Sequence, residues 1–476
     1  MQFRPSPNVS KRRFALSAGL ASLNMLVTAN AMAAEDMTQP TPSGIPEQSI
    51  ASQFTGLDPA LVARSELAKS GILYGINYVG EVLGNPRGGF DRGAIYEGFL
   101  EVYIDADLEK LLEWKGLTFH ASGFQLHGQG LTTNFIGNVN AVSNIEATPS
   151  TRLFDLWLEQ SLFDDKLSIR FGQLRVDYGG EFLSVGPGGI FISANYGWPS
   201  FTASNLPAGG VTFPLAGMGA RVKVEPADHL TLLFGVYNDN SAGPDCEGDP
   251  QVCNDHGLEF RLKDDPFVIA EAQVKYSLAS NGGLPGIFKA GAFRDYGKFD
   301  SQRFEVNGLS LADPLGSGVP RKHEGNFGLY AIVEQQIYQL DSADAGTGVS
   351  AFARIAGLPA DFNVVDFYLE GGLNFSGLVP DRPNDVFGIA VSYSRISGDA
   401  VSLDRDRNSI GTTNAVRDFE VLTELTYVAQ VMPGWTIQPD LQYIWRPGGN
   451  LQNDRAQPGK AIEDAVVVGL RSTVNY

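Results

Sequence analysis

Apolar and polar residues alternate at every second position in many segments of this chain, and most clearly in its last eleven residues. The even-numbered positions of this segment are apolar except for Ser472, and they are Val466, Val468, Leu470, Val474 and Tyr476. The odd-numbered positions are mostly polar or small, and they are Val467, Gly469, Arg471, Thr473 and Asn475. Successive side chains of a strand point to opposite faces, so the segment predicts a strand with one apolar and one polar face. An ordinary half-buried strand is one interpretation, and the final strand of a membrane barrel, closed by an aromatic residue, is the favoured one.

About sixteen segments of roughly ten residues share this alternation, an even number that is typical of single-chain membrane barrels. The predicted strands are 72–82, 96–108, 117–127, 152–160, 167–176, 214–225, 230–238, 268–276, 286–296, 325–337, 349–356, 365–376, 386–397, 419–431, 435–445 and 464–476.

Short and long connections alternate between these segments. The short ones include 163–166, 226–229 and 432–434, and the long ones are 128–151, 177–213, 239–267 and 297–324. A soluble sandwich or propeller has no reason for such alternation, whereas a barrel places short turns on one rim and long loops on the other. The sequence therefore predicts an all-β fold, a transmembrane antiparallel β-barrel with short periplasmic turns and long extracellular loops.

The amino terminus predicts export from the cytoplasm. Lys11, Arg12 and Arg13 precede an apolar stretch, and Ala31-Met32-Ala33 resembles a cleavage site, so 1–33 is predicted to be a secretory signal peptide. A flexible periplasmic linker rich in Pro, Gln, Ser and Thr is expected over 34–55.

A short helix is expected within 56–71, before the barrel at 72–476. Asp58 is suited to the N-cap, Pro59 to the first helical position and Gly71 to the stop, which predicts a helix over 59–70. The pattern leaves open whether this helix lies at the periplasmic mouth or in the lumen.

Composition excludes several classes of protein. The chain is 43% hydrophobic and has a mean hydropathy of −0.08, without the roughly 20-residue apolar run that a spanning helix needs. Its formal net charge of −19 argues against nucleic-acid binding. The five histidines show no metal-ligand spacing and no G-x-S-x-G motif accompanies them, so we expect neither an enzyme nor a cofactor or metal.

Parity assigns side chains to the lumen. Lipid-facing positions are expected to include Leu100, Val102, Ile104, Phe154, Leu156, Leu158, Ile169 and Phe171. The candidate pathway residues on the opposite parity are Glu97, Glu101, Asp155, Trp157, Glu159, Arg170 and Arg221. A further solvated lumenal wall is expected from Arg354, Glu370, Glu420, Glu424, Asp440 and Gln442. A charged lumen of this kind can exchange hydrogen bonds with the hydroxyls of a solute.

Arg170 is predicted to be the positive pole of a constriction, opposed by the carboxylates of Glu97, Asp155 and Glu159. An aromatic ring, Trp157 or Trp198, could pack there on an apolar face of the solute.

Several separate sequence segments resemble those of the carbohydrate-selective porins of the OprB type. They are RGAIYEG at 92–98, EKLLEWKG at 109–116, FHASGF at 119–124, SNIEATP at 143–149, TRLFDLWLEQ at 151–160, PDLQYI at 439–444 and PGG at 447–449. The resemblance implies a sixteen-stranded barrel with its own pore that admits glucose and related sugars across the outer membrane of a Gram-negative bacterium. The implied partners besides sugars are outer-membrane lipid and lipopolysaccharide, and the barrel-assembly machinery, met through the strand that ends at Tyr476.

Other functions stay open at this point. A general or cation-preferring diffusion pore is the main alternative, and a plugged structural or adhesive barrel is a third. The sequence does not decide which sugar is preferred or whether the barrels form a homotrimer. The connection 128–151 is the candidate for a loop that folds inward, because it is long, poor in acidic residues and rich in glycine and asparagine.

Cys246 and Cys253 lie in one long connection, on the oxidising outer side of the predicted barrel. We predict a disulfide between them. A metal site with Asp249, Asp255 and His256 is the alternative, disfavoured because the two cysteines are spaced too far apart for a zinc motif.

Overall fold

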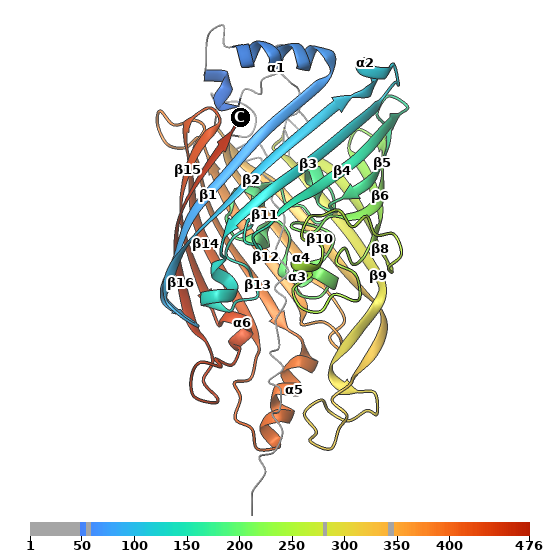
Figure 1. Ribbon diagram of the computed structural model, residues 1–476. Coiled ribbons are helices and arrows are strands. Elements are labelled where there is room, and N and C mark those ends of the chain that lie inside the picture. Colours follow the sequence, from blue (N-terminus) through green and yellow to red (C-terminus); the bar gives the residue numbers. More distant parts are fainter. Residues whose placement is uncertain (1–47, 54–58, 279–282, 341–346) are drawn as a thin grey trace, which may run out of the picture.

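Sixteen antiparallel strands form a closed barrel in chain order, with β16 hydrogen-bonded to β1 (Figure 1). The computed structural model describes residues 48–53, 59–278, 283–340 and 347–476. The prediction of a sixteen-stranded antiparallel barrel is confirmed. The predicted signal peptide and most of the predicted linker lie outside the described residues, while Ile50–Gln53 of the linker segment forms a 3-10 turn, η1.

The strand bounds agree with the alternating segments to within a few residues at most ends. They are β1 Ile72–Gly89, β2 Gly93–Asp107, β3 Leu117–Gly128, β4 Thr151–Leu162, β5 Leu167–Leu174, β6 Gly217–Ala227, β7 Leu230–Asn238, β8 Pro266–Ser277, β9 Pro285–Glu305, β10 Pro320–Gln339, β11 Gly348–Gly357, β12 Val365–Ser376, β13 Val386–Ile396, β14 Phe419–Met432, β15 Trp435–Trp445 and β16 Glu463–Asn475.

The α-helices are short and lie at the ends of the barrel or inside it. They are α1 Pro59–Ser70, α2 Leu108–Leu112, α3 Ser200–Ala203, α4 Pro250–Cys253, α5 Gly398–Ser409 and α6 Pro447–Asn450. Among the described residues, no helix is long and apolar enough to cross a membrane.

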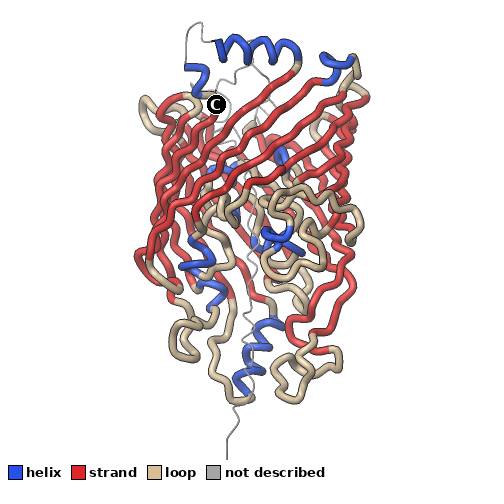
Figure 2. The backbone as a smooth tube through the Cα atoms, viewed as in Figure 1, coloured by secondary structure: helices blue, strands red, loops and turns tan. Residues whose placement is uncertain are grey.

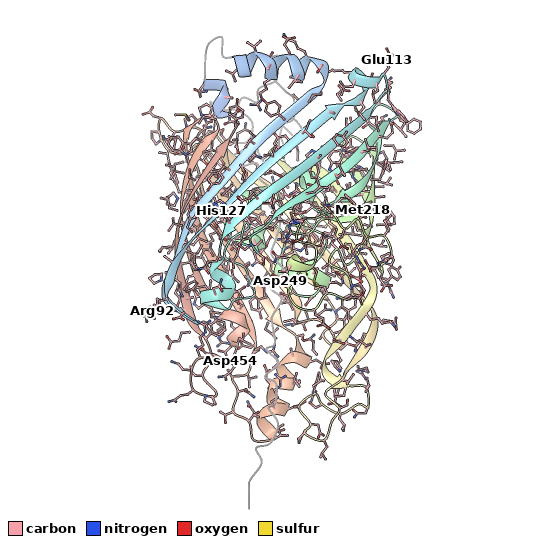
Figure 3. The ribbon with its side chains drawn as sticks, in the orientation of Figure 1. Arg92, Glu113, His127, Met218, Asp249 and Asp454 are labelled. Atoms are coloured by element: carbon pink, nitrogen blue, oxygen red, sulfur yellow. A yellow bond between two sulfur atoms is a disulfide. The ribbon has the colours of Figure 1, made fainter. Side chains whose placement is uncertain are left out.

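Helix α1 has the bounds expected from the sequence, and Gly71 ends it at a φ of 99°, a conformation that favours glycine. The helix lies across the rim that carries the short turns, near the carboxyl terminus (Figure 1). Arg64 holds it there, because its Nη2 donates to the carbonyl oxygen of Tyr74 at 2.8 Å. Figure 3 places Glu113 at the same rim and Asp454 toward the opposite end, where the long connections lie.

The outer surface of the barrel is apolar where parity predicted it. Val102 and Ile104 on β2, Phe171 on β5 and Leu470 on β16 are exposed, while their inward neighbours, such as Arg170 and Arg471, are buried. A surface in contact with hydrocarbon can carry such side chains without a penalty, whereas charges there are destabilising.

One residue of β4 faces the other way from the prediction. Ala121 pairs with Leu156 and Gly123 pairs with Leu153, so Ser122 opposes both Phe154 and Asp155 in a β-bulge. The prediction of a lipid-facing Phe154 is therefore wrong, since the extra residue keeps Phe154 and Asp155 both inside. Phe154 packs in a lumenal cluster, with ring centroids 5.0 Å from Phe124 and 5.9 Å from Phe213.

The strands β9 and β10 extend far beyond their neighbours. The sequence predicted a long loop over 297–324, but the two strands continue through half of it and only 306–319 connects them. Figure 1 shows the resulting hairpin projecting at the long-connection end of the barrel.

Two connections fold into the lumen and supply much of the core. The longer one, 175–216, leaves the short strand β5 and contributes fully buried side chains, among them Leu183, Phe191, Tyr196 and Trp198. The other, 129–150, buries Ile136 and Val142 in the same cluster. Figure 2 shows these loops and short helices lying behind and between the strands of the barrel.

Candidate functional site

Three charged residues predicted from parity lie in one row on adjacent strands. Glu159 on β4 is opposite Arg170 on β5, and Arg170 is opposite Arg221 on β6. All three face the lumen, because their neighbours Ile169 and Phe171 face outward and are exposed. The register of the barrel therefore places two guanidinium groups beside one carboxylate.

A fourth residue, Glu181 from the inward connection 175–216, completes an Arg–Glu quartet with Glu159, Arg170 and Arg221. Arg221 lies 2.8 Å from both carboxylates, and Arg170 lies 2.7 Å from Glu159 and 3.4 Å from Glu181. Two positive and two negative charges balance, so this part of the lumen is electrically neutral within a strongly acidic protein.

Two aromatic rings pack against Arg170, and they also contact each other edge to face, with centroids 5.4 Å apart. Its guanidinium carbon lies 4.5 Å from the centroid of Trp157 and 4.7 Å from that of Tyr178, distances typical of cation–π contacts. Trp157 stacks in turn on His120, with centroids 4.8 Å apart, and Arg175 lies 5.0 Å from the Tyr178 ring. We call His120, Trp157, Arg170, Tyr178 and Arg175 the arginine–aromatic stack.

Hydrogen bonds fix the members of the stack. The Nδ1 atom of His120 lies 2.7 Å from a carboxylate oxygen of Asp105, and Arg175 donates to Asp155 at 3.1 Å. Burial raises the pKa of the Tyr178 phenol well above its ordinary value, so Tyr178 stays neutral. A neutral phenol can both donate and accept a hydrogen bond.

The opposing carboxylates predicted for Arg170 are only partly correct. Glu159 pairs with Arg170, but Asp155 pairs with Arg175 and Glu97 lies in a different part of the lumen. Glu97 is directly across from Glu81 on β1, whose carboxylate binds Arg471 at 2.6 Å. Parity predicted the face of each residue and not its position around the barrel wall.

The two remaining expectations for this region also differ from the structure. Glu101 faces the lumen but accepts a hydrogen bond from Asn77 at 3.1 Å, outside the quartet. Trp198, predicted as a ring for the solute, is buried inside connection 175–216, where its Nε1 donates to the carbonyl oxygen of Gly209.

Three members of the site were missed in the sequence because they lie on connection 175–216, which folds inward. Tyr178 and Glu181 lie beyond the predicted strand 167–176, and alternation carries no signal outside strands. Arg175 falls within that predicted strand on the outward parity of Ile169 and Phe171, but β5 ends at Leu174 and Arg175 enters the lumen to pair with Asp155. His120 has the inward parity of β3 but was considered only as a metal ligand.

The wall expected to be solvated instead holds the inward connections. The carboxylate of Glu424 accepts from the backbone N–H groups of Ile192 at 2.6 Å and Ser193 at 3.0 Å. Glu420 accepts from the N–H groups of Val139 and Asn140. These contacts leave both carboxylates fully buried.

Arg354 and Gln442 serve the same purpose with their donors. Arg354 donates to the carbonyl oxygens of Asn195 at 2.6 Å and Gly197 at 2.9 Å, and it pairs with Glu370 at 2.9 Å. Gln442 donates to the carbonyl oxygen of Val142. We call Arg354, Glu370, Glu420, Glu424 and Gln442 the loop-anchoring wall, and the expectation that they are solvated is wrong.

The predicted inward loop enters the lumen, but it is not alone there. Within 129–150, Glu146 accepts hydrogen bonds from the backbone N–H and the hydroxyl of Thr132. Burial raises the pKa of Glu146 to about 7, although the hydrogen bonds from Thr132 oppose the shift. The larger inward connection, 175–216, carries the part that touches the quartet.

The cysteines of the connection between β7 and β8 are joined. Cys246 and Cys253 form a disulfide with Cα atoms 5.9 Å apart, so their thiols are not metal ligands. Asp249, labelled in Figure 3, lies within this loop and accepts a hydrogen bond from the hydroxyl of Thr148 at 2.6 Å. The disulfide loop thus packs against the inward connection 129–150.

Comparison with known proteins gives a family match over most of the chain. The family described as carbohydrate-selective porin, OprB family, matches residues 91–476. Porin B of Pseudomonas aeruginosa is 27% identical over 417 residues, which cover 83% of this chain and 87% of that protein.

Solved structures show the same fold. A high-pH structure of Pseudomonas putida OprB is 23% identical and superposes with a TM-score of 0.75, covering 87% of this chain and 96% of that chain. A low-pH structure of the same protein is aligned at 18% identity with a TM-score of 0.53, covering 90% of this chain and 98% of that chain.

Proposed function

The chain belongs to the carbohydrate-selective porins of the OprB family, and we propose that sugars cross its lumen by contact with the arginine–aromatic stack and the Arg–Glu quartet. A sugar presents hydroxyl groups around its edge and C–H groups on its faces. It therefore needs donors, acceptors and a flat apolar surface together. The observation that carries the proposal is Arg170, which packs against Trp157 and Tyr178 and is bound by Glu159 and Glu181.

The quartet supplies both kinds of hydrogen-bonding group. Guanidinium groups only donate and carboxylates only accept, so a hydroxyl that does both can bridge the two. Arg170 and Arg221 are almost fully buried, while the carboxylates of Glu159 and Glu181 keep part of their surface open to the lumen. Contacts at such an edge are weak and shared among several groups, which suits conduction because a tight site would trap the sugar.

Charge balance favours a neutral solute. An uncompensated arginine pair would attract anions and an uncompensated glutamate pair would attract cations, whereas the quartet has no net charge. Its members hold one another in place, so little rearrangement is needed when a hydroxyl binds. The neutral quartet favours a sugar pathway over a general or cation-preferring pore, because one sign of charge would dominate the narrow region of such a pore.

Liposome swelling tests this function. Proteoliposomes should admit glucose faster than a neutral amino acid of similar size, and faster than an anionic sugar acid. The double variant Glu159→Gln/Glu181→Gln leaves two arginines unbalanced and should raise the rate for the sugar acid relative to glucose severalfold. Equal rates for glucose and the amino acid in the native protein would support a general diffusion pore instead.

A matched control makes the same change of charge outside the lumen. The double variant Asp300→Asn/Glu324→Gln lies on the exposed β9–β10 hairpin, where these carboxylates pair with Lys322 and Lys298. It should leave all three swelling rates unchanged. A shift equal to that of the quartet variant would assign the effect to overall charge and exclude the quartet.

We also infer the route by which this outer-membrane porin reaches its place. Residues 1–33 are removed as a signal peptide, the strand ending at Tyr476 is bound by the barrel-assembly machinery, and the apolar outer face meets outer-membrane lipid and lipopolysaccharide. Amino-terminal sequencing of the protein from outer membranes should begin at Ala34. A sequence beginning upstream of Lys11 would contradict cleavage. Cross-linking in native membranes would decide between a single barrel and a homotrimer.

A further inference from the structure

Three carboxylates that the sugar pathway does not use converge at the extracellular ends of β7 and β8, beside the middle of β9. Asp239 directly follows β7, Asp265 directly precedes β8, and Asp295 lies on β9 beside Phe267 of β8. The backbone N–H of Asp239 donates to the carbonyl oxygen of Asp265 at 2.9 Å, which continues the sheet by one row. These contacts hold the three residues on neighbouring strands.

Gly297 on β9 makes room for the carboxylates. A Cβ atom at this position would lie 2.9 Å from Oδ2 of Asp239, 3.0 Å from Oδ1 of Asp295 and 3.8 Å from Oδ2 of Asp265. Oxygens from all three carboxylates therefore surround the same face of Gly297. Any larger residue would fill the space between them.

Two of the carboxylates are buried and only partly compensated. Asp239 is 6% exposed and Asp295 is fully buried. Oδ1 of Asp295 accepts from the backbone N–H of Gly297 at 2.8 Å, but Oδ2 of Asp295 and Oδ1 of Asp239 have no hydrogen-bond partner. Among the described residues, none of the ion pairs of this region includes Asp239, Asp265 or Asp295. The nearby Arg261 is bound bidentately by Asp264, at 2.6 and 2.7 Å. Buried carboxylates are normally paired with a cation, because leaving them unpaired is strongly destabilising.

A divalent cation bound between the carboxylates would balance their negative charge and coordinate the two oxygens that lack a partner.

We propose that Asp239, Asp265 and Asp295 bind a hard divalent cation, with Ca²⁺ preferred. The donors are all oxygens, and Ca²⁺ accepts irregular sets of six to eight oxygen ligands at about 2.3–2.6 Å, whereas Mg²⁺ demands a near-ideal octahedron. No set of three or more acidic, histidine or cysteine side chains stands at metal-ligand spacing in the described part of the chain. The cation must therefore draw the exposed Asp265 inward, and water completes its shell.

Such an ion would fasten the disulfide loop to the barrel wall. The connection 239–265 carries Cys246 and Cys253, and it touches the inward connection 129–150 through Asp249 and Thr148. A cation between Asp239, Asp265 and Asp295 ties both ends of connection 239–265 to β9. The extracellular vestibule would then be stiffened by extracellular Ca²⁺.

Calorimetric titration tests the site directly. The full chain, purified in detergent and freed of metal with a chelator, is titrated with CaCl₂ at pH 7. We expect one ion per chain, with a dissociation constant in the range of about 10⁻⁴–10⁻³ M found for extracellular sites.

Substitutions assign the signal to these residues. Asp239→Asn and Asp295→Asn should each weaken binding at least tenfold. Asp300→Asn is the matched control, because it removes an exposed carboxylate of β9 that is already paired with Lys322 at 2.6 Å. It should bind as the native protein does.

A third variant keeps the test informative if either asparagine variant fails to fold. Gly297→Ala places a Cβ among the oxygens without changing any charge, and it should also weaken binding. The proposal is overturned if the native protein takes up no Ca²⁺ at millimolar concentration, or if Asp295→Asn or Gly297→Ala binds as tightly as the native protein. The readout is cation binding, so it stands independently of the sugar pathway.

Discussion

Two walls of the lumen carry similar side chains and do different things. The loop-anchoring wall on β11, β12, β14 and β15 is fully buried, and its side chains form hydrogen bonds with the backbone of the inward connections. The Arg–Glu quartet of β4–β6, with Glu181, binds mainly among its own side chains and keeps part of two carboxylates open. The same residue types thus serve as anchors where they bind the backbone of a loop, and form the proposed pathway where they bind one another's side chains.

In the proposed pathway, selectivity depends on the inward connections and not on the barrel wall alone. A barrel of sixteen strands is wide enough to enclose an aqueous channel. The anchors hold connection 175–216 in the lumen, and that connection presents Tyr178 and Glu181 to the opposite wall. Breaking the anchors should therefore affect the pore more than changing any one pathway residue.

The largest effect is expected from Arg354→Ala. The change removes the donors to Asn195 and Gly197 and leaves Glu370 as an unpaired buried carboxylate, a loss of about 3–5 kcal/mol in the docking of the connection. Single-channel conductance should rise and the preference for sugars should fall. Arg395→Ala is the control, because it also removes an arginine from a buried carboxylate, Asp366, but Arg395 itself is half exposed. Native conductance in Arg354→Ala would contradict the anchoring role.

The anchoring of connection 129–150 should weaken as pH rises. Burial lifts the pKa of Glu146 from 4.5 to about 7, so the folded form binds a proton more tightly than the opened form. The docked loop is then most stable below pH 4.5 and loses roughly 3 kcal/mol as pH rises toward and past 7. Hydrogen exchange at the Thr132 amide should speed up over this interval. Glu146→Gln should flatten the slope, and an unchanged slope would assign the pH dependence to other groups.

A smaller effect is expected within the stack. Trp157→Leu removes the ring that contacts both His120 and Arg170 and should weaken glucose block of the ion current by about 1 kcal/mol, or roughly fivefold. Trp445→Leu changes a tryptophan that is exposed on the outer face and should leave the block unaltered. If Trp157→Leu and Trp445→Leu changed glucose block equally, the claim that sugars contact the stack would be contradicted.

The smallest effect is expected from Cys246→Ser. The disulfide closes one extracellular loop and crosses no strand of the barrel, so the resistance of the barrel to heat in detergent should not change. Protease cleavage within 239–265 should become faster. A loss of barrel stability comparable with that of Arg354→Ala would mean that the loop is part of the cooperative core.

The barrel itself could be predicted because each strand carries its own signal. Lipid on one side and polar lumen on the other impose alternation on every strand, and the strand bounds follow from it. The bulge at Phe154 and Asp155 escaped prediction because one extra residue reverses the parity of part of a strand. The long β9–β10 hairpin escaped it because its outer part stands clear of the membrane and lacks the same constraint.

The site could be predicted only as far as strands define it. Alternation assigned Glu159, Arg170 and Arg221 to the lumen, and the register of neighbouring strands brings them together. Glu181 and Tyr178 depend on how connection 175–216 folds, which is decided by contacts with strands far away in sequence, such as those of Glu424. Those long-range contacts leave no periodic trace in the chain.

The most direct test of the account is the glucose titration of Arg170→Ala in planar bilayers, beside Ile169→Ala as the lipid-facing control on the same strand. The barrel should fold, because Arg221 still pairs with both Glu159 and Glu181. Loss of charge-assisted hydrogen bonds should weaken sugar block of the ion current by about 1.5–3 kcal/mol, and ion selectivity should shift toward cations. Sugar block in Arg170→Ala that equals block in the native protein and in Ile169→Ala would contradict the claim that sugars pass along this wall.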